Sequence, residues 1–555
     1  MRRPVVYSLL GLLVVAGLLL SACGARAPER PYEETPFTEP MVLAAPDCEY
    51  GGLVQEVAAI DAHTVRFTLC RPDPAFLAKL AFSVFSIYPS EWLEYTAGET
   101  QRTEEGLSAP VGTGPYIVSE WARGESITFT RNPDYWGTPG IVDSIVFRWA
   151  SESAARLLEL QAGTVDAIDN LGPGDFEVAG ADSNLSVVIR PALNIFYVAM
   201  TDTFPPFDDV RVRQAVAMGI DRQRIVDIFY PPGSEVASHF APCAIPNGCA
   251  GPEWYDFDPE AARELLADAG FPEGFSSSLF YRDVVRGYLP EVPRVAEEIQ
   301  AQLRENLGIN VEIVQMESGA FIEESTAGRL DGFYLLGWTG DYPHITNFLD
   351  FHFGEANPQF GTPHPEIYEQ LVAGAQIADP DDSVDIYTAA NAAIRELVPM
   401  VPVAHGGSAV VYKADVEGGH ASPLGNEYFA VVNPGGRSTF VWMQNAEPIS
   451  LFCADETDGE SLRACEQVTE ALYTFEVGGT DVVPLLAEVC EPNDDLTVWT
   501  CTLRQGVTYS DGTAFDANDV VATFTMGLDA SSPLHRGNTA AWEYYGYLWG
   551  LMNVE

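Results

Sequence analysis

The sequence predicts an α/β protein whose chain folds into two lobes. The chain has 555 residues, which is more than one hydrophobic core accommodates, so at least two compact units are expected. Hydrophobic residues make up 47% of the chain and charged residues 20%, a balance typical of globular proteins. From about residue 210 onward, helical and extended patterns alternate, which favours helices packed on parallel or mixed sheets.

The first part of the chain is rich in extended patterns. Residues 57–69 (VAAIDAHTVRFTL) alternate between apolar and polar side chains and predict one strand. Residues 126–137 (SITFTRNPDYWG) predict a strand that ends in an aromatic loop rich in turn-forming residues.

Helices and buried strands alternate in the central part. Helical patterns cover residues 210–229, 258–271 and 293–308, and VEIVQMES and GFYLLGW predict buried strands. The second helix carries the usual end signals, with Asp258 as N-cap, Pro259 at the first helical position and Gly270 at the C-terminal end.

The last part predicts a hairpin followed by a helix. Residues 488–524 contain a strand, an Asn-Asp-Asp turn, a second strand, an Asp-Gly turn and a helix that begins near Asp516. Upstream, residues 433–436 (NPGG) separate two aromatic-rich strand patterns and predict a joint in the chain.

Residues 1–23 predict an export signal. Arg2 and Arg3 precede a short apolar run and the sequence Leu-Ser-Ala-Cys, an order typical of signal peptides rather than membrane-spanning helices. Leu-Ser-Ala-Cys resembles the lipobox of bacterial lipoproteins, which implies lipidation at Cys23. An ordinary cleaved signal with an incidental cysteine is the alternative. Residues 24–45 contain little that packs and predict a flexible tether.

The other eight cysteines form an even set, which in an exported chain indicates disulfides. No couple has CxxC spacing or nearby histidines, so disulfides are favoured over a zinc site. Sequence alone leaves the pairing open, and neighbours along the chain give the expected couples: Cys48 with Cys70, Cys243 with Cys249, Cys453 with Cys465, and Cys490 with Cys501.

Charge and motif content exclude several functions. The chain has 80 acidic and 29 basic residues, a formal charge of −51 that disfavours nucleic acid as a partner. The sequence has no HExxH, GxSxG or Walker-type motif, so no enzyme activity and no cofactor are expected.

Six segments carry a family resemblance. They are GTGPYIVSEW, RNPDYWG, PPFDDVRVRQAVAMGIDRQRIV, GWTGDYPHITNFLD, PMVPVAHG and LRQGVTYSDGTAFDANDV. Together they resemble the bacterial extracytoplasmic solute-binding proteins of family 5, the peptide- and nickel-type receptors of ABC importers. The resemblance implies a type II periplasmic-binding-protein-like fold of the large peptide-binding class, in which two α/β lobes joined by hinge strands close on a solute.

The order of these segments differs from that of the family. The block at 438–555, which includes the sixth segment, opens the chain in the family but lies last here. The chain is therefore expected to be circularly permuted, since exposed and neighbouring ends tolerate permutation. A gene-assembly or annotation error is the alternative. The new ends, near Pro46 and Glu555, are expected side by side in the first lobe.

A domain organisation follows from this order. The expected parts are the signal at 1–23, the tether at 24–45, the first part of lobe I at 46–195, lobe II at 196–432, a joining turn at 433–437 and the second part of lobe I at 438–555. The hinge is expected where the chain crosses between lobes, near 193–200 and 428–437.

The resemblance also implies ligand-binding residues. A free peptide carries an ammonium and a carboxylate, which an acidic side chain and an arginine can bind. In dipeptide-binding members the aspartate of a GWTGD segment takes the amino group, which corresponds to Asp341. An arginine before a helix similar to PRVAEEIQ takes the carboxylate, which corresponds to Arg286. Trp338 and Tyr288 are candidates for stacking on the ligand.

Other roles for these residues stay open. Asp341 precedes Tyr-Pro and is suited to capping a turn. Arg286 suits a solvated loop or an ion pair with Asp283, and Trp338 suits the core.

Three histidines raise the question of a metal site. His344, His352 and His364, with Asp341 and Glu355, match no compact ligand motif, so polar surface positions and no metal are expected.

The sequence thus predicts a monomeric, lipid-anchored receptor at the outer face of the membrane or in the periplasm. It is expected to capture a short peptide and deliver it to the permease subunits of an ABC importer and their ATPases. The alternatives are an oligosaccharide or a metal complex as the solute, a sensor that signals to a membrane kinase, and a secreted lipoprotein hydrolase.

Overall fold

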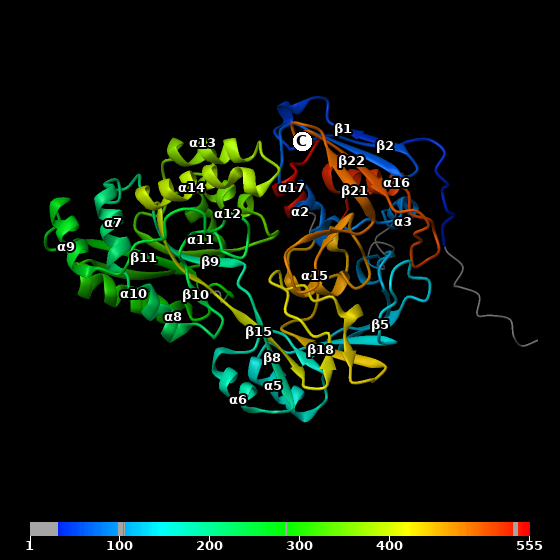
Figure 1. Cartoon of the computed structure of the whole chain (residues 1–555), viewed down its shortest axis with the longest axis horizontal. Helices are drawn as coiled ribbons and strands as arrows, with labels where there is room; N and C mark the ends of the chain where they lie inside the picture. Colours follow the sequence, from blue (N-terminus) through cyan, green and yellow to red (C-terminus); the bar gives the residue numbers. More distant parts are fainter. Residues whose placement is uncertain (1–30, 98–103, 105, 283–285, 537–541, 555) are drawn as a thin grey trace, which may run out of the picture.

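The computed structural model describes residues 31–554 apart from 98–103, 105, 283–285 and 537–541. The signal peptide and Cys23 lie outside the described residues. Two bodies are visible in Figure 1, one in green and one that combines blue, cyan, yellow, orange and red segments. We call the second body lobe I and the green body lobe II. Segments from both ends of the chain therefore fold together in lobe I.

Lobe I contains an antiparallel sheet built from the two ends of the chain, in the order β1-β2-β3-β22-β21. Its strands are β1 Val42–Ala44, β2 Val54–Asp61, β3 Thr64–Leu69, β21 Ala487–Pro492 and β22 Val498–Leu503. Neighbouring helices are α2 Phe76–Leu80, α3 Ser90–Thr96, α16 Ala517–Leu528 and α17 Glu543–Leu548. Asp516 caps α16 through a capping box with Asp519, as its sequence signal predicts.

A second, mixed sheet of lobe I has the order β4-β5-β6-β18-β7-β15-β8. Its strands are β4 Tyr116–Ala122, β5 Ser126–Arg131, β6 Ser144–Trp149, β7 Ala167–Ile168, β8 Leu185–Arg190, β15 Ser408–Lys413 and β18 Thr439–Gln444. Nearby helices are α5 Ser153–Ala162, α6 Phe176–Ala181 and α15 Gly459–Cys465. Two small strand pairs complete the lobe: β16 Val416–Glu417 with β17 Asn433–Pro434, and β19 Tyr473–Phe475 with β20 Val482–Pro484.

Lobe II is built on a mixed sheet in the order β10-β14-β9-β13-β11-β12. Its strands are β9 Asn194–Met200, β10 Glu235–Val236, β11 Ser276–Arg282, β12 Asn310–Met316, β13 Phe333–Thr339 and β14 Met400–His405. Its helices are α7 Val210–Gly219, α8 Arg222–Phe229, α9 Pro259–Asp268, α10 Val292–Leu307, α11 Ser318–Thr326, α12 Ile345–Phe353, α13 Pro365–Gly374 and α14 Pro380–Leu397. Every residue of β9 is buried, because helices cover both faces of its sheet.

Short 3-10 turns connect these elements. They span Cys48–Tyr50, Ser83–Phe85, Pro173–Asp175, Phe429–Val431 and Cys453–Asp455.

Two predicted elements are each divided in the structure. The strand expected at 57–69 is a hairpin, β2 and β3, because Asp61 turns the chain by accepting a hydrogen bond from the His63 amide. The helix expected at 210–229 is two helices, α7 and α8. The second begins at a new N-cap, Asp221, which accepts from the Arg224 amide.

The described part of the expected tether is packed rather than free. The Tyr32 hydroxyl donates to Oδ2 of Asp511 over 2.7 Å, and β1 pairs with β2. Leu43 is buried in the core of lobe I. Residues 42–44 form a strand of the sheet and therefore do not belong to a flexible tether. The tether is limited to residues before about 32.

Sheet membership moves the boundary of lobe II from 432 to about 405. Strand β15 pairs with β8 along its whole length, from Ser408 opposite Arg190 to Lys413 opposite Leu185, and so belongs to lobe I. The chain crosses between the lobes at 191–193 and 406–407. The crossing expected near 428–437 is wrong for this reason, since that segment lies wholly within lobe I.

The two crossings are tied together by Asn194. Its side-chain Nδ2 donates to the Gly406 carbonyl over 2.7 Å, and its Oδ1 accepts from the Gly406 amide over 2.8 Å. The Asn194 carbonyl also lies 2.6 Å from Nδ1 of His405. A Cβ at Gly406 would meet the Gly287 carbonyl oxygen at 2.1 Å, so the close approach of these segments requires glycine there.

The two ends of the described chain meet in lobe I. The Leu53 amide donates to the Trp549 carbonyl over 2.6 Å. This contact lies in lobe I, just before the start of β2.

The eight cysteines come together as the four couples expected from the sequence. Their Cα–Cα distances are 5.5, 4.9, 6.0 and 3.9 Å in chain order, with the sulfur atoms of each couple at disulfide distance. Each couple links positions within one lobe, so none of the four ties lobe I to lobe II. Over the described part of the chain, the helices are too short or too polar to cross a bilayer.

Candidate functional site

A cavity of about 540 Å³ lies between the two lobes. Lobe II supplies the end of β13, residues of α12 and the segment after β11, and lobe I supplies one face of α17. Figure 1 shows α17, in red, on the side of lobe I that faces α12. The four residues singled out from the sequence, Asp341, Arg286, Trp338 and Tyr288, all line this cavity.

Asp341 follows β13 and is held by donors from both lobes. Asn347 of α12 donates through Nδ2 to Oδ2 of Asp341 over 3.0 Å, and the Tyr544 hydroxyl of α17 donates to Oδ1 over 2.9 Å. Burial raises the pKa of Asp341 to about 6, and the two hydrogen bonds offset part of this rise. Among the described residues, no cation ranks among the groups that shift this pKa.

Asn347 fixes the backbone at the end of β13. Its Oδ1 accepts from the Asp341 amide over 2.9 Å and from Nε1 of Trp338 over 3.2 Å. One buried amide side chain thereby orients both the carboxylate and the indole. The turn-capping role that the sequence leaves open for Asp341 is carried by Asn347 instead.

Aromatic rings form one wall of the cavity. The Trp338 ring stacks on Phe351 with centroids 4.7 Å apart, and Phe351 meets Tyr547 of α17 edge to face at 5.1 Å. Trp338 is partly buried against the core of lobe II and also lines the cavity.

The other side of the cavity is basic. Arg282 ends β11, and Arg286 follows in a tight turn in which Arg286 and Leu289 exchange backbone hydrogen bonds of 3.3 and 3.0 Å. The Tyr288 ring packs over Gly337, where a Cβ would meet it at 2.3 Å. Asp283, which the sequence offers as a partner for Arg286, lies outside the described residues. The cavity is therefore lined by the acidic Asp341 and by the two arginines Arg282 and Arg286.

Sequence reasoning missed the contribution of the C-terminal block to this site. Glu543, Tyr544 and Tyr547 line the cavity from a six-residue helix, α17, whose pattern is too short to stand out. Asn347 and Arg282 were missed as well. No motif in the sequence marks either residue.

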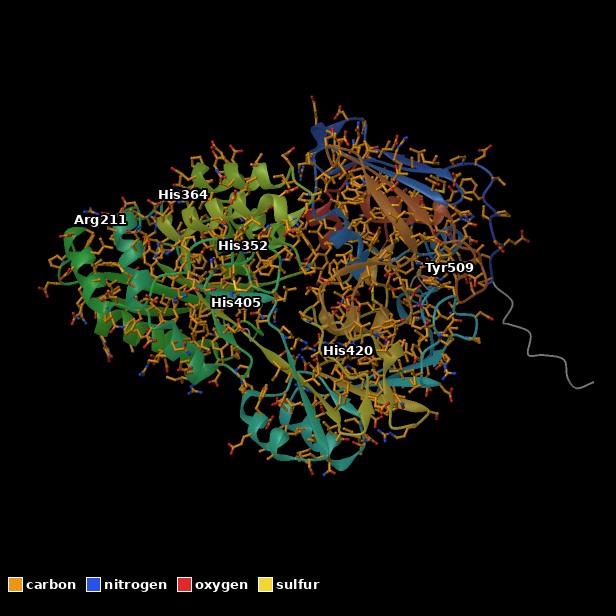
Figure 2. The ribbon with its side chains drawn as sticks, viewed as in Figure 1. Arg211, His352, His364, His405, His420 and Tyr509 are labelled. Atoms are coloured by element: carbon orange, nitrogen blue, oxygen red, sulfur yellow. A yellow bond between two sulfur atoms is a disulfide. The ribbon has the colours of Figure 1, made fainter. Side chains whose placement is uncertain are left out.

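The histidines occupy separate positions rather than a common site. His344 caps α12, His352 is buried with Nδ1 2.7 Å from the Phe348 carbonyl, and His364 lies 3.0 Å from Asp202; the last two are labelled in Figure 2. The expected surface position is wrong for His352, because the apolar face of α12 turns it inward among aromatic rings. Burial lowers the pKa of His352 to about 3. In the part of the chain that the structure describes, no three metal-ligating side chains gather at one point.

Comparison with known proteins decides the family. Residues 26–360 and 481–543 match the model of the bacterial extracellular solute-binding proteins, family 5. The chain belongs to this family. The chain is 33% identical to a dipeptide-binding protein of Pseudomonas aeruginosa over 396 residues, which cover 68% of this chain and 72% of that protein.

Solved structures of this family have the same fold. HbpA2 from Haemophilus parasuis matches with a TM-score of 0.62 at 28% identity, over 69% of this chain and 76% of that one. A dipeptide-binding protein from Pseudoalteromonas in complex with Met-Leu matches with a TM-score of 0.56 at 28% identity, again over 69% and 76%. The expected two-lobed, type II fold is confirmed. These relatives are binding proteins of a family described as extracellular, in agreement with the expected export.

Proposed function

We propose that this protein captures a short peptide with free ends between its two lobes and delivers it to the permease of an ABC importer. The observation that carries the proposal is the pairing, in one interlobe cavity, of the buried Asp341 carboxylate with Arg282 and Arg286. A zwitterion complements such a cavity at both ends. Relatives named for dipeptide and di/tripeptide binding support the same solute class.

The amino end of the peptide binds at Asp341 in this proposal. Among the described residues, the carboxylate accepts from the neutral donors Asn347 and Tyr544, so an ammonium supplies the opposite charge. A charge-assisted hydrogen bond of this kind contributes about 1.5–3 kcal/mol.

The carboxylate end binds at Arg286, with Arg282 beside it. The aromatic wall of Trp338 and Phe351 then lies along the peptide, and its rings accept apolar side chains without selecting one. The cavity volume of about 540 Å³ falls within the range of about 300–1,000 Å³ that small-molecule sites occupy. That size favours a dipeptide or tripeptide over a long peptide.

Capture and delivery use the crossings at 191–193 and 406–407 as the hinge. Closure brings α17 of lobe I onto a ligand held by lobe II and presents one face of the closed protein to the permease. We further propose that the protein acts as a monomer anchored by a lipid at Cys23, with residues up to about 32 as the tether.

Circular permutation is part of the proposal. The family model matches in two separate segments, and the second of them, 481–543, lies near the end of the chain. The contact between Leu53 and Trp549 supports this proposal. In the usual order of the family, the segment that contains Trp549 would be followed directly by the segment that contains Leu53, so the two should lie close together. Intact mass of the protein from its natural source would expose an assembly error.

The deciding experiment combines native mass spectrometry with calorimetry. The purified protein is analysed for a co-purifying solute, then titrated with Ala-Phe, N-acetyl-Ala-Phe and Ala-Phe amide. The proposal predicts that the free dipeptide binds and that each blocked form binds at least about tenfold more weakly. A co-purifying sugar or metal complex, or equal affinity for the three peptides, would contradict it. Recovery of the dipeptide as free amino acids would instead favour a hydrolase.

A further inference from the structure

Lobe I contains a second cavity that shares no lining residue with the interlobe cavity. Its volume is about 330 Å³, at the lower end of the range of about 300–1,000 Å³ for small-molecule sites. Three segments of lobe I enclose it, at 81–86, 422–428 and 466–485. Peptide capture as proposed above makes no use of this space.

The cavity is acidic. Glu466, Glu470 and Glu476 line it, and its lining, all within the described residues, contains no Lys, Arg or His. Glu470 is fully engaged, because Tyr135 donates to Oε1 and Thr113 and Trp136 donate to Oε2. Glu470 therefore has a structural role that leaves little capacity for a ligand.

Glu466 has capacity to spare. Asn426 donates to its Oε1 over 2.6 Å, and the Ser83 hydroxyl is the other side chain that acts on it as a donor. Since a carboxylate accepts about four hydrogen bonds, Glu466 can accept more. Burial raises the pKa of Glu466 to about 7, and the neighbouring Ser83 and Asn426 groups offset part of the rise. Arg463 lowers this pKa and Glu427, its ion-pair partner, raises it.

Ser83 supplies a second sign that the cavity suits a ligand. Ser83 is 5% exposed and lines the cavity, and its hydroxyl makes no hydrogen bond of ordinary geometry among the described residues, although it lies close enough to Glu466 to lower the pKa of that group. A buried hydroxyl without a well-placed partner costs about 1–3 kcal/mol, which a hydrogen-bonding group of a ligand would offset.

Part of the cavity lining is apolar. Phe475, Val483 and Leu485 line it, together with Ala471. The acidic side chains of the cavity are not gathered as a metal site, since no such group exists in the described part of the chain. With no basic residue to bind a carboxylate, the cavity does not suit a zwitterion.

We propose that this cavity binds a small organic cation, with its ammonium group at Glu466 and Ser83 and its apolar body against Phe475, Val483 and Leu485. The ammonium donates one hydrogen to Oε2 of Glu466 and another to Oγ of Ser83. The site is separate from the peptide site and does not depend on it. It gives the protein a second ligand class, the apolar primary amines.

Calorimetric titration of the whole protein with phenethylamine at about pH 8 tests the proposal. One amine is expected to bind per chain, and 2-phenylethanol, which lacks the charge, is expected to bind at least about tenfold more weakly. Affinity should fall between about pH 8 and pH 6 as Glu466 takes up a proton. Absence of binding at about 10 mM amine, or equal binding of the alcohol, would overturn the proposal.

Two variants separate this site from the peptide site. Glu466→Gln should weaken phenethylamine at least about tenfold and leave Ala-Phe binding unchanged, whereas Asp341→Asn should leave phenethylamine binding intact. Glu476→Gln is the matched control, since it removes the same charge from the exposed mouth of the cavity and should change affinity by less than about threefold. Amine binding that survives Glu466→Gln but not Asp341→Asn would assign the amine to the interlobe cavity and refute the proposal.

A cavity-filling variant covers the case in which Glu466→Gln does not fold. Ala471→Leu places three further carbon atoms in the cavity and keeps Glu466 in place. It is expected to abolish phenethylamine binding while the protein still binds Ala-Phe. Retained amine binding in this folded variant would also refute the proposal.

Discussion

The Tyr544 hydroxyl lies 2.9 Å from Oδ1 of Asp341, although the two residues are 203 positions apart and belong to different lobes. Tyr544 comes from α17 at the end of the chain, and Asp341 follows the strand at the centre of lobe II. Both residues line the interlobe cavity, and their contact links the two lobes there. A ligand group bound at the Asp341 carboxylate would therefore contact residues of both lobes.

We expect Asp341→Asn to stabilise the ligand-free protein. The pKa of Asp341 is about 6 in the folded state, above its ordinary value of 3.8. Between these pH values the folded protein keeps a proton that the unfolded chain has lost, so stability from this group falls as the pH rises from about 4 to about 6. Removing the charge should raise the free energy of unfolding at pH 7 by at most roughly 3 kcal/mol.

Chemical denaturation of wild type and Asp341→Asn at about pH 4 and pH 7 measures this effect. The difference between the two proteins should be small at the lower pH and largest at the higher one. A difference of the same size at both pH values would mean that burial of the charge is not its cause. The same variant should bind Ala-Phe poorly, so stability and function change in opposite directions.

Peptide affinity should depend on pH through the same group. An ammonium gains most from an ionised carboxylate, so the affinity for Ala-Phe is expected to fall as the pH decreases through about 6. Titrations at several pH values between about 5 and 8 measure the change, which should approach tenfold per pH unit at the acidic end. N-acetyl-Ala-Phe is the control, and an equal pH dependence for this peptide would remove Asp341 as the cause.

The sequence singled out Trp338, Asp341 and Arg286 because they lie in or beside short, recognisable segments. Trp338 and Asp341 belong to a single motif, and Arg286 precedes a recognisable helix, so matching to a family pattern locates them. Tyr544 and Asn347 have no such motif. Their roles arise only when α12 and α17 pack beside β13, which depends on contacts between the two lobes rather than on local pattern.

Sequence patterns predicted the long elements of the fold more accurately than the turns that divide them. Strong periodic elements such as α10 and β13 were located to within a few residues, because their apolar faces are continuous. The hairpin at Asp61 and the break at Asp221 were missed, since one polar residue inside an apolar pattern gives little warning of a turn. The position of β15 depends on its pairing with β8, more than 200 residues earlier, which no local signal encodes.

Arg286→Ala should weaken only those ligands that carry a free carboxylate. The expected loss for Ala-Phe is about 1.5–3 kcal/mol, the contribution of a charge-assisted hydrogen bond. For Ala-Phe amide the same substitution should have little effect. Calorimetry of both proteins with both peptides gives the coupling energy directly. Equal losses for the two peptides would assign Arg286 to the structure of its loop rather than to the ligand.

Mass mapping of the unreduced protein should find no free thiol among the eight paired cysteines. The couples span 22, 6, 12 and 11 residues along the chain, so each closes a short loop within one lobe. Such links restrict the unfolded chain and typically stabilise by about 2–4 kcal/mol, without restraining movement of the lobes. Reduction is therefore expected to lower the unfolding temperature and to leave peptide affinity in the folded protein unchanged. Detection of a peptide that joins two different couples would contradict the pairing.

Asn194→Ala should loosen the hinge as well as the fold. The substitution removes two hydrogen bonds to Gly406 across the interlobe crossings, and the Gly406 amide and carbonyl are left without these partners in a buried position. The expected loss in the free energy of unfolding is about 1–3 kcal/mol, measured by denaturant titration. Asn194→Asp is the matched control, because it keeps an acceptor for the Gly406 amide but places a carboxylate against the Gly406 carbonyl, and it should destabilise the protein at least as much. Small-angle X-ray scattering with and without Ala-Phe then reports whether the altered hinge still closes. A ligand-free alanine variant with wild-type stability and an unchanged scattering profile would show that Asn194 does not hold the crossings together.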